Sequence, residues 1–339
     1  MSVYDNKDVT VVITCHERKE FVVEAIKSVI KQSFSRERYE IILVIDFKDP
    51  DLIEYCRNNE VYYLFTNEAG IGYKMALGIE RAKTDIICFL NDDDRFHVDK
   101  LRIIYDRFKQ SKELTYIHNN QIFINHMGEV IGKNGTTLQQ ELFFDITDLN
   151  FFTARRAMKQ HLFFNDSSIS VKKNEIAHYG GALKDIHGLQ DNFLFYFSII
   201  SRKSLLFLPE ALTYFRLHSE SSSFVNNSKT DKFCLLLKRR LKSIYSILVV
   251  HHELISDTFI RNLIYGDLRS TYIQYQIMNC SKCSSPNLDL LAPRYLRIRD
   301  FDLTFFLVYS RIFLFILFIA HKLFPKTSKS LLLMQYLRK

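Results

Sequence analysis

Four short apolar segments alternate with helical patterns in the first hundred residues, and this alternation constrains the fold more than any other feature. The segments, rich in β-branched residues, are 9–15 (VTVVITC), 39–46 (YEIILVID), 61–65 (VYYLF) and 86–90 (IICFL). Apolar residues recur at helical spacing between them, most clearly over 19–32 and 70–82. Apolar strands that alternate with helices are typical of a parallel sheet covered by helices. The sequence therefore predicts an α/β fold with right-handed crossovers.

Acidic residues follow two of these predicted strands. Asp46 ends the second segment, and Asn91-Asp92-Asp93-Asp94 follows the fourth. Ligands bind such sheets beyond the carboxyl ends of the strands. Adjacent carboxylates raise each other's pKa unless a cation offsets their charge, and Mg²⁺ or Mn²⁺ prefers oxygen ligands. The cluster therefore predicts a divalent-cation site, with a solvated loop that caps a helix over 98–108 as the alternative.

Weaker patterns continue the same domain. Shorter strands with a Gly-containing turn, added antiparallel to the sheet, are expected within 114–150. A packed helix is predicted over 191–201, and a short strand over 205–209. No internal repeat interrupts this order.

Charge divides the chain into two regions. Residues 1–225 carry 28 basic and 31 acidic side chains, a net of −3, whereas residues 226–339 carry 18 and 7, a net of +11. The polar segment 219–231 is the best linker candidate, and helical periodicity resumes over 232–250 and 254–278. We therefore expect a first domain of residues 1–225 and a basic, α-helical region of residues 226–339.

Five segments occur in the order and spacing of a known family. They are VTVVITCHER, YEIILVID, GIGYKMALGIERAKTDIICFLNDDDRF, HYGGALKDIHGLQDNFLFYF and LPEALTYFRLHSESSS. Over about residues 9–224 the chain resembles family 2 glycosyltransferases of the GT-A fold. The resemblance implies a Rossmann-like, nucleotide-sugar-binding domain with a mostly parallel sheet. It also implies an inverting enzyme that moves a sugar from a nucleoside-diphosphate sugar to an acceptor hydroxyl.

The resemblance assigns the donor-binding residues. Thr14, His16, Glu17 and Asp46 stand where the family contacts the nucleobase and ribose, and an acid there can accept the imide N–H of uracil or a ribose hydroxyl proton. Lys74 stands where it could meet the diphosphate together with helix N-terminal amides. The alternative for Lys74 is a solvated lysine on the helix surface.

The resemblance also assigns the cation site. Asp92, Asp93 and Asp94 resemble the DXD element that carries Mg²⁺ or Mn²⁺ between the donor phosphates. Asp92 is also expected to contact the donor itself. Such an ion offsets charge on the departing diphosphate. Arg216 and His218 match the motif that closes the catalytic domain and are expected to face the diphosphate or the ion.

Asp191 matches the general base of the family. One carboxylate that takes the acceptor proton, without a covalent nucleophile, gives inversion. Asp191 is alternatively an N-cap of the helix over 192–201, and it could serve in both ways. Gln190 replaces the usual acid before the base.

Three further positions depart from the family pattern. Asn91 stands where the family usually has Asp, so the ion could be bound by Asp92 and Asp94 or by Asp93 and Asp94. Leu77 replaces a common Asn, and Phe47 replaces the second acid of an Asp-Asp pair. An inactive or repurposed nucleotide-sugar-binding relative is therefore the alternative function.

Other signals are weak or absent. Cys280 and Cys283 form a single CxxC with no second pair, which favours free thiols over zinc. The adjacent His251 and His252 would face different sides of a helix, and neither GxxxxGK[ST] nor GxGxxG occurs. Six cysteines in 339 residues and a polar N-terminus without a signal peptide predict a reduced, cytoplasmic location.

The basic C-terminal region contains its longest apolar run at 303–320, with Arg311 as its one charge. Basic residues on both flanks favour a helix that lies in the headgroup layer of an anionic membrane, or a re-entrant segment, over a clean crossing. The alternatives are a buried helix on the catalytic domain or in a homo-oligomer, and nucleic-acid binding, which the apolar composition disfavours. The expected location is therefore the inner face of the cell membrane, with a lipid-linked glycan or polyprenyl carrier as acceptor.

Overall fold

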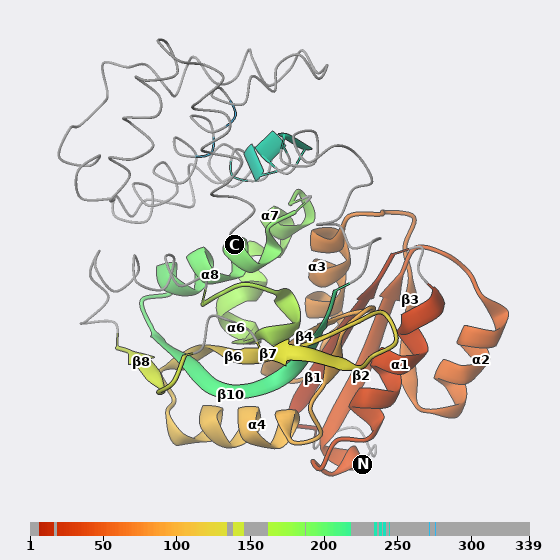
Figure 1. Ribbon diagram of the computed structural model, residues 1–339, viewed down its shortest axis with the longest axis horizontal. Coiled ribbons are helices and arrows are strands. Elements are labelled where there is room, and N and C mark those ends of the chain that lie inside the picture. Colours follow the sequence, from red (N-terminus) through yellow and green to blue (C-terminus); the bar gives the residue numbers. More distant parts are fainter. Residues whose placement is uncertain are drawn as a thin grey trace. The chain divides into compact units, whose positions relative to one another are not determined.

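The structure is a computed structural model whose described residues are 7–16, 19–133, 138–145, 162–186 and 188–217, with scattered positions between 234 and 275. The chain divides into two compact units, Met1–His218 and Ser219–Lys339. The first unit contains the sheet and the helices that cover it (Figure 1).

The first half of the sheet is parallel, as predicted. Its strands lie in the order β3-β2-β1-β4. The elements are β1 (Val9–Cys15), α1 (Lys19–Ile30), the 3₁₀ turn η1 (Arg36–Arg38), β2 (Tyr39–Ile45), α2 (Pro50–Asn58), β3 (Val61–Phe65), α3 (Ile71–Arg81) and β4 (Ile86–Asn91). Helix α1 packs on the face that carries Val11 and Ile13, and Gly78 of α3 lies against Val12 on the other face. Every residue of β1 is buried because both faces are covered.

The second half of the sheet is mixed. The strand order continues β4-β9-β6-β10-β5. Strands β6 and β10 are parallel, and the other neighbouring strands in this order are antiparallel. Strand β7 pairs with β6 and strand β8 pairs with β10, and both pairs are antiparallel. The strands are β5 (Arg95–Phe96), β6 (Leu114–Ile124), β7 (Val130–Lys133), β8 (Leu142–Phe144), β9 (Ile169–Lys172) and β10 (Ser204–Arg216). The strand predicted over 205–209 was too short. It continues past Pro209 because the pairing with β6 is irregular between Leu208 and Ala211, where a missing N–H is tolerated.

The remaining helices are α4 (Lys100–Gln110), η3 (Asp166–Ser168), α6 (Lys173–Ile176), η4 (Ala177–Tyr179), α7 (Gly180–Lys184) and α8 (Gln190–Ile200). Helices α3 and α7 lie close together because residue 72 is glycine. A Cβ there would lie 2.3 Å from the carbonyl oxygen of Leu183 and 2.5 Å from that of Ile186. This close approach fixes α3, which carries Lys74, relative to the segment that leads to α8.

The described positions of the second unit are helical; they are Cys234, Leu235, Leu237, Lys238, Arg240, Leu241, Ile244, Thr271 and Tyr275. The helical character of the region as a whole stays a prediction. Cys234 is disulfide-bonded, which the cysteine count did not predict. Among the helices of the described part of the chain, none combines the length and apolar character that a membrane crossing requires. Three sequence features of this region lie outside the described residues: the apolar run 303–320, the CxxC of residues 280–283 and the histidine pair 251–252.

Candidate functional site

The candidate site lies at the edge of the sheet where parallel strands β1, β2 and β4 end. His16 follows β1, Asp46 follows β2, and Asp92 follows β4. The backbone N–H of His16 donates to Oδ2 of Asp92 at 3.1 Å, and the His16 ring Nδ1 contacts Oδ2 of Asp46. The structure therefore brings these three predicted residues together, as expected for the carboxyl ends of parallel strands.

Asp46 and Lys74 form a buried ion pair. The Lys74 Nζ donates to Asp46 Oδ2 at 2.8 Å and to the carbonyl oxygen of Ala69 at 3.3 Å. Burial acts to raise the pKa of Asp46, but the hydrogen bonds from Lys74 and His16 outweigh it and lower that pKa. The Lys74 side chain is fully buried, so its interpretation as a solvated helix lysine is wrong.

The acidic loop, Asn91–Asp94, is held against the end of β1 by Thr14. The carbonyl oxygen of Thr14 accepts the N–H of Asp92 at 3.1 Å, and its hydroxyl donates to Asn91 Oδ1 at 3.3 Å. The side chains of Asp92 and Asp94 are buried, whereas Asp93 is half-buried. Asp93 is thus the carboxylate of this loop that is most open to solvent.

Asp94 is turned toward the protein. Its Oδ1 accepts the N–H of Arg216 at 3.0 Å, and its Oδ2 accepts the side-chain amide of Asn165 at 3.1 Å. Burial, and then the negative charge of Asp93, raise the pKa of Asp94 to about 7, against the lowering effect of hydrogen bonds from Ser167, Arg216 and Asn165. The loop therefore concentrates negative charge that a cation would offset.

No group of three or more His, Cys, Asp or Glu side chains within the described ranges is arranged to hold a metal ion. Two predicted site residues, Glu17 and His218, lie outside those ranges. Among the predicted cation ligands, the structure describes Asp92, Asp93 and Asp94 of the acidic loop.

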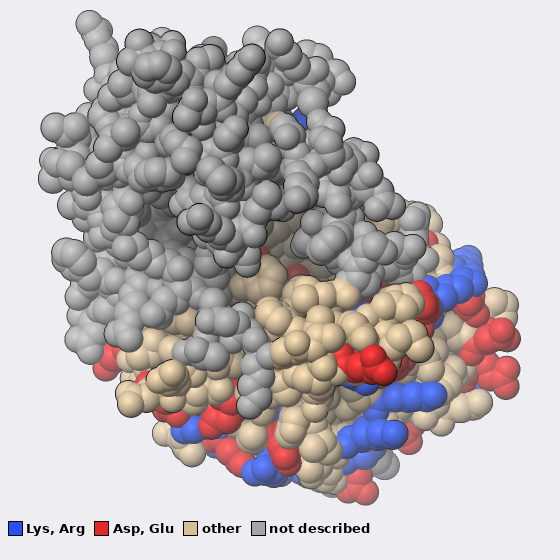
Figure 2. All heavy atoms as spheres, in the orientation of Figure 1, with Lys and Arg blue, Asp and Glu red and all other residues tan. Residues whose placement is uncertain are grey.

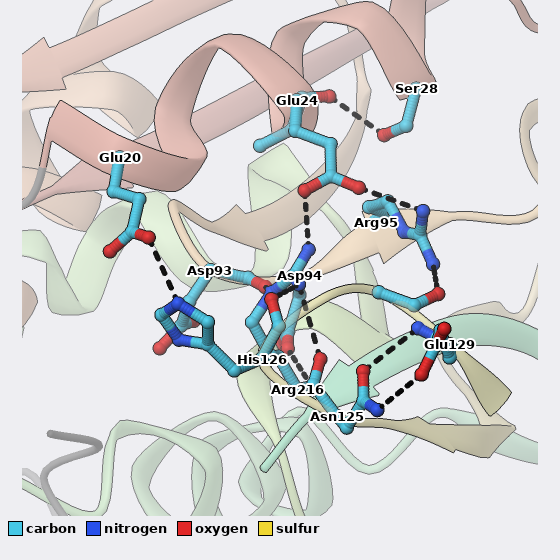
Figure 3. Close-up of polar contacts among 12 residues, drawn as sticks. Glu20, Glu24, Ser28, Asp93, Asp94, Arg95, Asn125, His126, Glu129 and Arg216 are labelled. Carbon is cyan, nitrogen blue, oxygen red and sulfur yellow. Dashed lines mark hydrogen bonds and ion pairs between the residues drawn. The ribbon is translucent and has the colours of Figure 1, made fainter. Parts of the chain in front are cut away.

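Arg216, at the end of β10, lies against this loop and contacts it through its guanidinium (Figure 3). Its guanidinium donates to the carbonyl oxygen of Asp93 at 2.8 Å and to those of Asn125 and His126 at 3.2 and 2.6 Å. It also pairs with Oε2 of Glu24 on α1 at 2.5 Å. The side chain is only 1% exposed. The Arg216 guanidinium therefore holds the backbone of the acidic loop in place. The sequence instead predicted that it contacts the diphosphate or the ion.

Asp191 lies in the first turn of α8, with its carboxylate turned toward Asn165. The Asp191 Oδ2 accepts the backbone N–H of Asn165 at 3.2 Å, and its Oδ1 accepts the N–H of Asn192 at 2.8 Å. Its interpretation as the N-cap is wrong, because α8 begins at Gln190 with Leu189, at φ +59°, in the capping position. Since Asn165 also bonds Asp94, one residue connects the acidic loop with the candidate base.

The sequence did not predict three polar residues of this site, namely Asn165, Asp166 and Tyr116. Asp166 is buried, and its Oδ1 has no hydrogen-bond partner among the described residues. Burial, then the charges of Asp191 and Asp94, raise its pKa well above the ordinary value. The buried hydroxyl of Tyr116 likewise has no partner within the described ranges, and its pKa is raised by burial and then by Asp191 and Asp166. The only sequence signal was the polar run NDSS (165–168) between apolar segments.

Residues 10–173 match the sequence model of "Glycosyl transferase family 2". This segment is a family 2 glycosyltransferase domain. The chain is 29% identical over 133 residues to an uncharacterized glycosyltransferase of Rickettsia conorii. The aligned residues make up 38% of this chain and 22% of that protein. An uncharacterized glycosyltransferase of Rickettsia felis is 30% identical over 132 residues, 38% of this chain and 21% of that protein. The chain thus spans about a fifth of these relatives.

Solved structures share the fold. The domain of S. aureus TarS comprising residues 1–349 matches with a TM-score of 0.56 at 10% identity, over 98% of this chain and 91% of that one. The same TarS domain in complex with UDP-GlcNAc matches with a TM-score of 0.51 at 12% identity, over 81% of this chain and 87% of that one. The prediction of a GT-A α/β fold with a mostly parallel central sheet is confirmed.

Proposed function

We propose that this protein is an inverting glycosyltransferase that moves a sugar from a nucleoside-diphosphate sugar to an acceptor hydroxyl. The observation that carries the proposal is the convergence of Asp191 and the acidic loop, joined through Asn165, at the strand ends of a family 2 domain. A carboxylate beside a phosphate-binding edge is what such a transfer requires. The UDP-GlcNAc complex of TarS supports a nucleotide sugar as donor.

The donor nucleoside is proposed to lie over Thr14, His16 and Asp46. Asp46 is held as a carboxylate by Lys74, which lowers its pKa together with His16 against the effect of burial. A carboxylate can accept the imide N–H of uracil or a ribose hydroxyl. Lys74 serves this site by fixing Asp46 and by offsetting its charge.

A divalent cation, Mg²⁺ or Mn²⁺, fits the acidic loop through Asp93. Such ions are commonly held by one or two carboxylates together with substrate phosphates, so a cage of three protein ligands is not needed. When bound, the ion would stabilise charge on the leaving nucleoside diphosphate. Asp92 and Asp94 are buried, and their part is to shape the loop and to raise its negative potential.

Asp191 is proposed to accept the proton of the acceptor hydroxyl while that oxygen attacks the anomeric carbon. The C–O bond to the acceptor forms as the bond to the diphosphate breaks on the opposite side, which inverts the anomeric configuration. The N–H groups of Asn165 and Asn192 hold both Asp191 oxygens and keep the carboxylate oriented.

A panel of nucleotide sugars with and without Mn²⁺ tests donor and ion together. A donor at about 100 times its Kd stabilises the folded state by about 2.7 kcal/mol, so the correct nucleotide sugar should raise Tm. We expect this rise to grow when Mn²⁺ is present. A panel in which no nucleotide sugar shifts Tm would contradict the proposal, and a shift without sugar transfer would favour the inactive or repurposed relative.

The lipid-linked acceptor and the membrane location rest on the +11 charge of residues 226–339. In Figure 2, acidic and basic side chains are interspersed on the described part of the visible face. That part of the surface therefore offers no comparable attraction to an anionic membrane. We expect the full-length protein to sediment with anionic vesicles at low salt and to be released from them at high salt. Protein that stays in the supernatant at low salt would contradict membrane contact, and salt-dependent shifts of unrelated DNA or RNA would favour nucleic-acid binding instead.

A further inference from the structure

Asn165 has an unusual backbone conformation for a residue with a side chain. It precedes η3 with φ +75° and ψ 114°, and it is buried. Non-glycine residues with positive φ are uncommon, and strain of this kind persists where surrounding contacts over-determine it. The contacts at Asn165 therefore have to account for its conformation.

Three hydrogen bonds of Asn165 involve different partners. Its side-chain Oδ1 accepts the N–H of Ser167 at 3.1 Å, which orients the amide. The Nδ2 of that amide donates to Oδ2 of Asp94 at 3.1 Å, and the backbone N–H donates to Oδ2 of Asp191 at 3.2 Å. One residue thus holds an oxygen of a carboxylate after β4 and an oxygen of a carboxylate on α8.

The two carboxylates come from elements that are far apart in the sequence, so their relative orientation depends on what joins them. The backbone angle at Asn165 sets the direction of its N–H relative to its side chain. A change in that angle would move one donor away from its carboxylate.

We propose that Asn165 is a positioning residue that couples the acidic loop to the candidate base, with its side chain fixing Asp94 and its backbone N–H fixing Asp191. The inference rests on the proposed function, because coupling matters only if donor-side and acceptor-side chemistry occur at these carboxylates. Asn165 is assigned no contact with either substrate in this proposal.

Asn165→Gly separates this role from simple support of the fold, because glycine keeps the positive φ without strain but lacks the amide. A hydrogen bond to a charged group is worth enough to change a rate by about 10- to 100-fold, so we expect a fall in kcat of that size. The donor KM should stay within about 3-fold of the wild-type value, because the nucleoside contacts are unaffected. Asn165→Ala should show the same fall in kcat and a lower Tm, since alanine is strained at this φ.

Asn120→Ala is the matched control. The Asn120 amide donates to the carbonyl oxygens of Pro209 and Leu138 at 2.9 and 3.2 Å, and these two hydrogen bonds go to backbone groups rather than to a carboxylate. This variant should lower Tm and leave kcat within about 2-fold of wild type. Three outcomes would each overturn the proposal. The first is a kcat within about 2-fold of wild type for Asn165→Gly, and the second is a loss of kcat in Asn165→Ala alone. The third is an equal loss of kcat in Asn165→Gly and Asn120→Ala.

A double-mutant cycle on Tm decides the amide–carboxylate contact without any activity. If Asn165 holds Asp94, the effects of Asn165→Gly and Asp94→Asn on Tm should be non-additive by about 2 to 8 °C. Additive effects would overturn the inference. A wild-type protein that transfers no sugar would refute the proposed function, and the cycle would still test this contact.

Discussion

Asp191→Asn is expected to lower kcat by about 10²- to 10⁴-fold, the contribution of a general base in proton transfer. Asparagine keeps the size of the side chain, and its Oδ1 can still accept one of the two backbone N–H groups that hold Asp191. It cannot take up the acceptor proton. Initial rates with saturating donor and acceptor measure the effect, and donor binding by calorimetry should stay within about 3-fold of wild type.

Asp185→Asn is the matched control for this prediction. Asp185 is an exposed aspartate at the end of α7, on the segment that leads to α8. Its replacement removes the same charge from the same region and should leave kcat unchanged. Full transfer by Asp191→Asn would show that the proton goes elsewhere, and the buried carboxyl of Asp166, whose pKa the charge of Asp191 helps to raise, would then be the first group to replace.

The parallel half of the fold could be predicted because its signals are local. Each strand from β1 to β4 is a continuous apolar run, and α1 and α3 keep helical spacing. Strands that run in parallel end at one edge, so the placement of Asp46 and the acidic loop at the same edge, where both contact His16, could be expected from the order of elements.

The orientation of side chains at that edge depends on contacts between distant residues, which local patterns do not contain. Asp94 is turned inward by Asn165, 71 residues away, and by Arg216, 122 residues away. Neither partner could be paired with Asp94 from the sequence, so which carboxylate stays open to solvent could not be predicted.

Two local interpretations failed for the same reason. Lys74 looks like a surface residue of an amphipathic helix, yet its charge is paired with Asp46 inside the protein. Asp191 has the residue type of an N-cap, yet its carboxylate bonds Asn165 across the site, and Leu189 takes the capping position. In both cases a tertiary contact outweighs the local preference.

Arg216→Met is expected to destabilise the protein by about 3–5 kcal/mol, because it removes a buried guanidinium and leaves three backbone carbonyl oxygens without their donor, at about 1–3 kcal/mol each. The guanidinium satisfies the carbonyl oxygens of Asp93, Asn125 and His126, and methionine would leave them without this donor. Tm should fall by about 10 °C. Thermal unfolding followed by circular dichroism measures the change.

Arg216→Lys and Arg95→Lys show whether charge or shape matters. Lysine keeps the positive charge at residue 216, but one ammonium cannot reach Glu24 and all three carbonyl oxygens, so we expect most of the loss to remain. Arg95 also pairs with Glu24, at 2.7 Å, but its side chain is 25% exposed, so Arg95→Lys should cost about 1 kcal/mol or less. Equal losses at the two positions would mean that the ion pair to Glu24 carries the stability. A loss confined to residue 216 would mean that the guanidinium acts on the backbone of the acidic loop, which is how it would keep Asp93 directed toward a donor phosphate.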